Sequence, residues 1–94
     1  MSLAEIRKRI DAIDEEILSL LHRRFRLALR TRTFKTMPHD PSREREILGR
    51  VKAAAKRYPL LRPNFLLGLY KEVLRESRRL QARSGREIDQ EKQR

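Results

Sequence analysis

Cysteine is absent from the 94-residue chain, and so is tryptophan. Without cysteine there is neither a disulfide framework nor thiol chemistry, which suits a reducing compartment. No stretch approaches the roughly 20 apolar residues that a membrane span requires. The first residues also lack the apolar run that is typical of a signal peptide. We therefore exclude thiol enzymes, and we expect a cytoplasmic protein with no membrane partner.

Motifs for metals, phosphates and nucleophiles are also missing. The chain has only three glycines, and they form no glycine-rich phosphate loop. The histidines and acidic residues do not have the spacing of metal ligands. No Ser/His/Asp combination suggests an activated nucleophile. We therefore expect no cofactor and no metal, and any chemistry has to proceed without a covalent intermediate.

Positive charge is what the sequence has in excess. Lys and Arg number 24 against 13 Asp and Glu, which gives a net charge of +11. Such a balance predicts an anionic partner, either a nucleic acid or a small polyanion. Aromatic residues make up only 5% of the chain, and no basic face interleaved with aromatics is visible. A basic helical nucleic-acid-binding module stays an alternative, but we expect no nucleic-acid partner.

Apolar periodicity predicts an all-α fold with three helices per chain. From Leu3 to about Phe34 there is no Pro or Gly, and apolar residues recur at heptad positions a and d. Two proline-containing breaks follow, and they delimit shorter helices at about 41–57 and 63–82. We expect one helical domain over residues 1–83 and a polar, disordered tail over 84–94.

Two helix starts carry capping signals. Ser2 is followed three residues later by Glu5, which is the spacing of a capping box. Asp40 precedes Pro41, and this order predicts Asp as N-cap with Pro at the first helical position. Both signals agree with the helix boundaries that the periodicity predicts.

One position of the long apolar seam carries a charge. Arg24 occupies the a position between Leu20 and Leu27, where a guanidinium is costly unless an anion meets it. That anion is either a carboxylate of another helix, in a buried ion pair, or a ligand bound inside the bundle. Lys35 would lie on the same face of an ideal helix, roughly 16 Å further along its axis. The two cations would then flank a small dianion.

Arg7 lies too far along the same helix to join that pocket. About 25 Å of helix rise separate it from Arg24, and about 42 Å separate it from Lys35. A helix of some 33 residues would be about 50 Å long, whereas a compact domain of about 100 residues has a radius of gyration near 13 Å. We therefore expect the helix to overhang its own chain. An intertwined antiparallel homodimer would cover it and bring Arg7 of one chain towards Arg24 of the other.

The remaining polar residues complete a recognisable order. Taken by periodicity alone, the run Arg43-Glu44-Arg45-Glu46 is a solvated charge run, and the Ser77/Gln81 pair is an interface edge. In chain order, however, the sequence contains Ile6-Arg7-x-x-Ile10-Asp11, Leu20-Leu21-x-x-Arg24, Lys35, Asp40-x-x-Arg43-Glu44 and Glu76-Ser77-x-x-x-Gln81. From Leu3 to about Gln81, this pattern resembles the all-helical class of chorismate mutases.

The resemblance implies an isomerase and a homodimer with two active sites. The reaction would be the pericyclic [3,3] rearrangement of chorismate to prephenate, the branch step towards phenylalanine and tyrosine, without cofactor or metal. The implied catalytic residues are Lys35, Gln81, Arg24 and Glu44. The implied substrate-binding residues are the partner's Arg7 together with Arg24, Lys35, Asp40, Arg43, Glu44, Ser77 and Gln81.

The resemblance also implies individual roles. Arg24 and the partner's Arg7 would grip the two substrate carboxylates, with Ser77 assisting at one of them. Lys35 and Gln81 would face the ether oxygen. Glu44 would accept a hydrogen bond from the ring hydroxyl, with the backbone near Asp40 assisting.

One departure and one close alternative accompany the resemblance. Arg78 follows Ser77 at a position where many relatives have an aliphatic pocket wall, and we expect its side chain to face solvent. An isochorismate pyruvate-lyase of the same fold is the close alternative. Glu44 favours the mutase, because a carboxylate there suits the hydroxyl position of chorismate.

Overall fold

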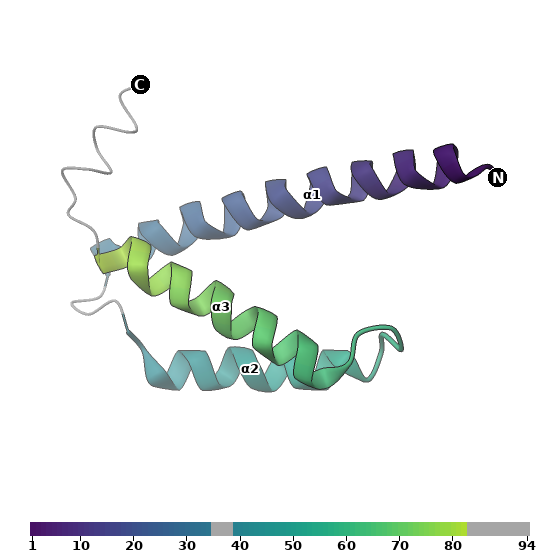
Figure 1. The fold of residues 1–94 in the computed structure, drawn as a ribbon. Coiled ribbons are helices and arrows are strands. Elements are labelled where there is room, and N and C mark those ends of the chain that lie inside the picture. Colours follow the sequence, from purple (N-terminus) through teal and green to yellow (C-terminus); the bar gives the residue numbers. More distant parts are fainter. Residues whose placement is uncertain (35–38, 83–94) are drawn as a thin grey trace, which may run out of the picture.

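The computed structural model describes residues 1–34 and 39–82. Their elements are α1 (Leu3–Arg30), the short 3-10 helix η1 (Thr31–Thr33), α2 (Pro41–Ala55) and α3 (Pro63–Ala82), as Figure 1 shows. No strand occurs in these two ranges, so the predicted all-α fold with three helices is confirmed. Lys35 and the tail predicted over 84–94 lie outside the described residues.

The two predicted helix starts are confirmed. The Ser2 hydroxyl accepts a hydrogen bond from the Glu5 amide at 3.1 Å, and α1 begins at the next residue after Ser2. An Asp40 carboxylate oxygen accepts from the Arg43 amide, also at 3.1 Å, and Pro41 opens α2. Each cap satisfies one of the four amides that a helix N-terminus leaves without an intrahelical partner.

The end of α1 comes earlier than predicted. The α-helix stops at Arg30 rather than near Phe34 and continues only as one 3-10 turn. Thr31 and Thr33 each donate their hydroxyl to a main-chain carbonyl three residues earlier, at 2.6 and 3.1 Å. β-Branched residues that bond the backbone in this way disfavour further α-helix. The expectation that Lys35 lies on the same helix face as Arg24 assumed an α-helix that continues to residue 35. Because α1 ends at Arg30, that assumption does not hold.

The hydrophobic core lies between α2 and α3. These helices run in opposite directions and are joined by the turn over residues 56–62 (Figure 1). α2 also ends slightly before its predicted end, because the Lys56 and Arg57 amides bond to carbonyls three residues back instead of four. The buried side chains at the centre of the core are Ile47, Val51, Ala55, Leu66 and Leu74.

The long helix α1 packs much less than the other two. None of its residues is buried. Its C-terminal part meets α3, whereas its N-terminal half runs clear of α2 and α3 (Figure 1). The apolar seam predicted from the heptad pattern stays 42–61% exposed along its whole length: Leu3, Ile6, Ile10, Ile13, Ile17, Leu20 and Leu27. The single chain therefore leaves this seam uncovered, which agrees with the predicted overhang.

The overall dimensions reflect the same arrangement. The radius of gyration is 16.5 Å, against about 13 Å for a compact domain of 100 residues. Over residues 1–34 and 39–82, every helix is too short or too polar to cross a membrane.

Candidate active site

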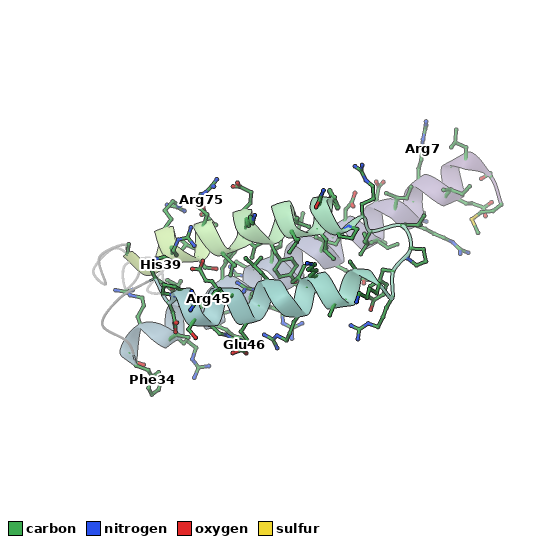
Figure 2. All side chains as sticks on the ribbon, turned by 90° about the horizontal axis from the view of Figure 1, so that it is seen from below. Arg7, Phe34, His39, Arg45, Glu46 and Arg75 are labelled. Carbon is green, nitrogen blue, oxygen red and sulfur yellow. The ribbon has the colours of Figure 1, made fainter. Side chains whose placement is uncertain are left out.

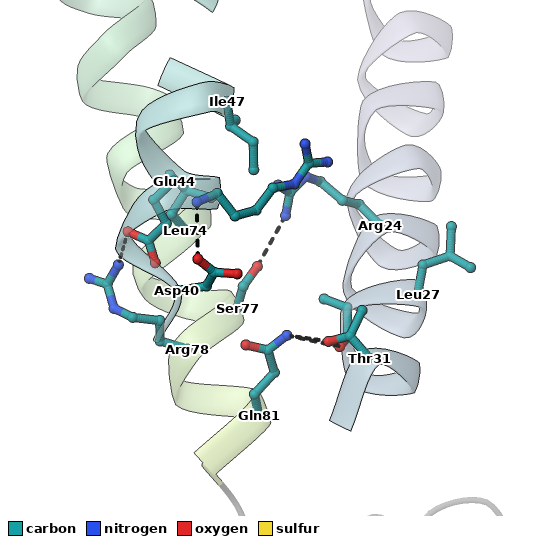
Figure 3. Close-up of a pocket in the computed structure, with 12 residues that line it drawn as sticks. Arg24, Leu27, Thr31, Asp40, Glu44, Ile47, Leu74, Ser77, Arg78 and Gln81 are labelled. Atoms are coloured by element: carbon teal, nitrogen blue, oxygen red, sulfur yellow. Dashed lines mark hydrogen bonds and ion pairs between the residues drawn. The ribbon is translucent and has the colours of Figure 1, made fainter. Parts of the chain in front are cut away.

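A pocket of about 270 Å³ lies where the end of α1, the start of α2 and the second half of α3 come together (Figure 3). Each of the three segments contributes four lining residues at positions i, i+3, i+4 and i+7, the spacing that puts side chains on one helix face. The first segment contributes Arg24, Leu27, Ala28 and Thr31; the second, Asp40, Arg43, Glu44 and Ile47; the third, Leu74, Ser77, Arg78 and Gln81.

The size and charge of the pocket indicate the kind of ligand that it can take. Pockets for small organic ligands begin at about 300 Å³, so this one suits a small molecule. Its lining contains three arginines and two acidic residues. Three positive charges less two negative ones leave a net charge of +1, which favours an anionic ligand.

Arg24 meets a serine instead of an acidic residue. Its Nη1 donates to the Ser77 hydroxyl at 3.1 Å, and Ser77, which is buried, donates in turn to the Val73 carbonyl at 3.1 Å. Within the described ranges, no carboxylate forms an ion pair with Arg24. The alternative of an ion pair between helices is therefore not found there, and Arg24 retains N–H groups that can bind an anion.

Gln81 connects the C-terminal ends of α1 and α3. Its Nε2 donates to the Ala28 carbonyl and to the Thr31 hydroxyl, both at 2.9 Å. The Ala28 carbonyl also accepts from Thr31 at the end of α1, so Gln81 adds a hydrogen bond from α3 to this last turn. Both N–H groups of the amide are engaged with α1, and donation to a ligand requires the exchange of one of them.

Glu44 of α2 and Arg78 of α3 form an ion pair at one side of the pocket. The Arg78 Nη1 lies 2.5 Å from the Glu44 Oε1, and the two side chains are 33% and 19% exposed (Figure 3). The expectation that Arg78 faces solvent is therefore wrong. Position 78 lies four residues after Leu74 and three before Gln81, so the helical repeat turns it towards the pocket.

The charge run at the start of α2 divides between surface and pocket. Arg43 forms an ion pair with Glu46 one turn later, and both side chains are at least half exposed. Asp40 engages one carboxylate oxygen in the N-cap. The interpretation as a solvated run therefore holds for Glu46, whereas Glu44 lines the pocket and Arg43 both pairs with Glu46 and lines the pocket.

Arg7 does not reach the pocket of its own chain. It is exposed and lies at the far end of α1 (Figure 2), about 25 Å of helix rise from Arg24. Lys35 lies outside the described residues. The structure brings the other predicted site residues together: Arg24, Asp40, Arg43, Glu44, Ser77 and Gln81.

Sequence reasoning missed two polar lining residues, Thr31 and Arg78. Both lie at helical spacing from a predicted site residue: Thr31 is seven residues after Arg24, and Arg78 is three residues before Gln81. Extending the i, i+3, i+4, i+7 pattern from the predicted residues would have found them.

Together, the fold and the pocket define a small all-helical domain with a pocket of net positive charge where its helices meet. The chain belongs to the chorismate mutase type II family, which matches residues 6–82. It is 42% identical over 78 residues to the "Bifunctional chorismate mutase/prephenate dehydratase" of Aquifex aeolicus (strain VF5). That similarity covers 77% of this chain and 22% of the relative, so the chain spans only a small part of the relative's length. No solved structure matches the chain.

Proposed function

We propose that the protein catalyses the rearrangement of chorismate to prephenate. The observation that carries this proposal is Arg24, a guanidinium from an apolar seam that donates to Ser77 and pairs with no carboxylate in the described residues. Chorismate carries two carboxylates and would supply the missing anion. Membership of the chorismate mutase type II family supports the same reaction.

The reaction places few chemical demands on the protein. One C–O bond breaks while one C–C bond forms, and neither a proton transfer nor a nucleophile is needed. Chorismate reacts only from a compact conformer that is scarce in water, so cations that grip both carboxylates promote the reaction by positioning. Arg24 with Ser77 would bind one carboxylate, Arg7 of the partner subunit would bind the other, and Arg43 would shape the site.

Electrostatic stabilisation would supply the remaining catalysis. The ether oxygen gains negative charge as its bond to the ring breaks, so donors aimed at it stabilise the transition state more than the substrate. Gln81 would give up one of its hydrogen bonds to α1 and donate to this oxygen, next to Lys35. Glu44 would accept a hydrogen bond from the ring hydroxyl of the substrate, and the backbone near Asp40 would assist. The role of Lys35 rests on the sequence resemblance.

We also propose that the active unit is an antiparallel homodimer. A second copy would cover the seam of α1, which stays 42–61% exposed in the single chain. It would also supply Arg7, which lies too far from the pocket of its own chain. A cytoplasmic location stays a prediction.

Incubation of the purified protein with chorismate and, separately, with isochorismate tests the function. We expect prephenate from chorismate, and a loss of about 10²–10³ in kcat for Lys35→Ala, because one transition-state donor is removed. The matched control is Lys52→Ala, which changes an exposed lysine of α2 outside the pocket. Salicylate and pyruvate from isochorismate, without prephenate from chorismate, would establish the lyase instead. Salt-dependent nucleic-acid binding without mutase activity would favour the basic binding module.

A further inference from the structure

The ion pair between Arg78 and Glu44 differs from the other Arg–Glu pairs of the described residues. The others join residues three apart on one helix, and their side chains are 41–67% exposed: Arg43–Glu46, Arg75–Glu72 and Arg79–Glu76. Hydrogen bonding and charge attraction from Glu76 raise the pKa of Arg79, but exposed pairs of this kind contribute little to stability. The Arg78–Glu44 pair instead joins α3 to α2 and lines the pocket.

The Glu44 carboxylate keeps capacity to accept a further hydrogen bond. Its Oε1 accepts from Arg78, while its Oε2 lies 3.8 Å from the His39 Nε2, which is beyond hydrogen-bonding distance. An ionised carboxylate offers about four acceptor positions on its two oxygens. Arg78 can therefore bind one oxygen of the Glu44 carboxylate while the other oxygen accepts a hydrogen bond from a hydroxyl group of a bound molecule.

Charge balance explains why a cation is needed beside Glu44. The substrate proposed above carries two carboxylates, and Glu44 and Asp40 bring two more to the same pocket. An unpaired Glu44 would repel such a dianion, and its side chain would be free to turn towards solvent. Arg78 offsets this charge at 2.5 Å and restrains the carboxylate from the neighbouring helix.

We propose that Arg78 is a positioning residue that holds Glu44 against the substrate hydroxyl and so makes the pocket selective for a hydroxylated dianion. This inference rests on the proposed function. Arg78 acts through Glu44, so its removal weakens binding of substrate and transition state alike. Such a loss raises KM and leaves kcat nearly unchanged.

The test compares Arg78→Met with Arg75→Met. Both variants remove one positive charge from α3 by the same substitution, but Arg75 pairs on the exposed face with Glu72 and lies outside the pocket. For chorismate, we expect Arg78→Met to raise KM about tenfold, which corresponds to one hydrogen bond to a charged group. Arg75→Met should match the wild type. Arg78→Gln, which keeps a polar helix-forming side chain, carries the same test should the Met variant fail to fold.

A double-mutant cycle with Glu44→Gln separates positioning from a structural role. If Arg78 acts through Glu44, Arg78→Met adds little to the KM of the Glu44→Gln protein. Both single variants should also lose the preference for chorismate over an analogue without the ring hydroxyl. The proposed role of Arg78 would be overturned by equal KM values for Arg78→Met and Arg75→Met. It would also be overturned if the increases in KM caused by Arg78→Met and Glu44→Gln multiply in the double variant. Neither result would affect the proposed function. A wild-type protein that does not convert chorismate would overturn both proposals.

Discussion

Arg24 interrupts the apolar seam of α1 and donates to Ser77 on α3 at 3.1 Å. A guanidinium at such a position is unfavourable for packing, because its desolvation is offset only where an anion meets it. Local conflicts of this kind are expected at functional sites. At the scale of the residue, replacement of Arg24 should therefore lower activity without lowering stability.

We predict that Arg24→Met strongly impairs catalysis without unfolding the protein. Loss of a charge-assisted contact to a substrate carboxylate costs roughly 2–5 kcal/mol, so kcat/KM should fall at least about thirtyfold. The thermal midpoint should stay the same or rise, because an apolar side chain suits the seam better. Steady-state kinetics and thermal melts measure the two effects. Arg23→Met changes an exposed neighbour and serves as the control. A lowered midpoint with preserved kcat/KM would show that Arg24 is structural.

At the scale of the element, the end of α1 and the start of α2 form much of the pocket. The 3-10 turn after Arg30 places Thr31 beside Gln81, and the Asp40 cap sets the first turn of α2, which carries Glu44. Beyond Ile47, α2 contributes no residue to the pocket, and its buried residues Val51 and Ala55 belong to the hydrophobic core. Its exposed face can therefore be altered without effect on the site.

Gly49 offers such a change. It lies exposed in the interior of α2, and a Cβ built on it meets nothing within 4 Å. Gly49→Ala should stabilise the fold by about 0.5–1 kcal/mol, and a domain of this size gains about 4–8 °C in midpoint per kcal/mol. Circular dichroism melts measure the shift, and activity should not change. Ala53→Gly, at another exposed position of α2, should shift the midpoint the other way. Destabilisation by Gly49→Ala would indicate that another surface covers this face.

The whole molecule is dominated by the overhang of α1. Its 28 residues make a rod of about 42 Å, and its seam meets little of its own chain. Arg7 lies near the N-terminal end of this rod (Figure 2), whereas the pocket is lined by residues towards its C-terminal end, from Arg24 on. A site shared between two copies would explain both the length of the helix and the distance.

Mixing two inactive variants tests the shared site. Arg7→Ala retains Lys35, and Lys35→Ala retains Arg7, so a mixed dimer contains one intact site. After subunit exchange at equal amounts, we expect about a quarter of wild-type activity, because half of the dimers are mixed and half of their sites are complete. The control mixes Lys35→Ala with Arg24→Met. Both changes affect residues that one chain contributes to the same site, so activity should not return. Demonstrated exchange without recovery in the first mixture would rule out a shared site.

Local signals in the sequence accounted for much of the fold. Ser2 and Asp40 predicted two helix starts, because capping depends on neighbouring residues. The end of α1 was predicted too late, since the periodicity continues past Arg30 while Thr31 bonds to the backbone. Arg78 was misplaced because the sequence shows its helix face but not the Glu44 that faces it from α2.

The sequence alone therefore determined the three helices, the N-caps of two of them and a set of cations and polar groups at helical spacing, since each depends on contacts within about one turn. The crossing of α1, α2 and α3 decided which of these groups share a pocket. In the folded chain Arg24 donates a hydrogen bond to Ser77, Gln81 donates to the end of α1, and Arg78 donates to Glu44. These partners are more than 30 residues apart in the chain, so only packing of the helices brings them within hydrogen-bonding distance.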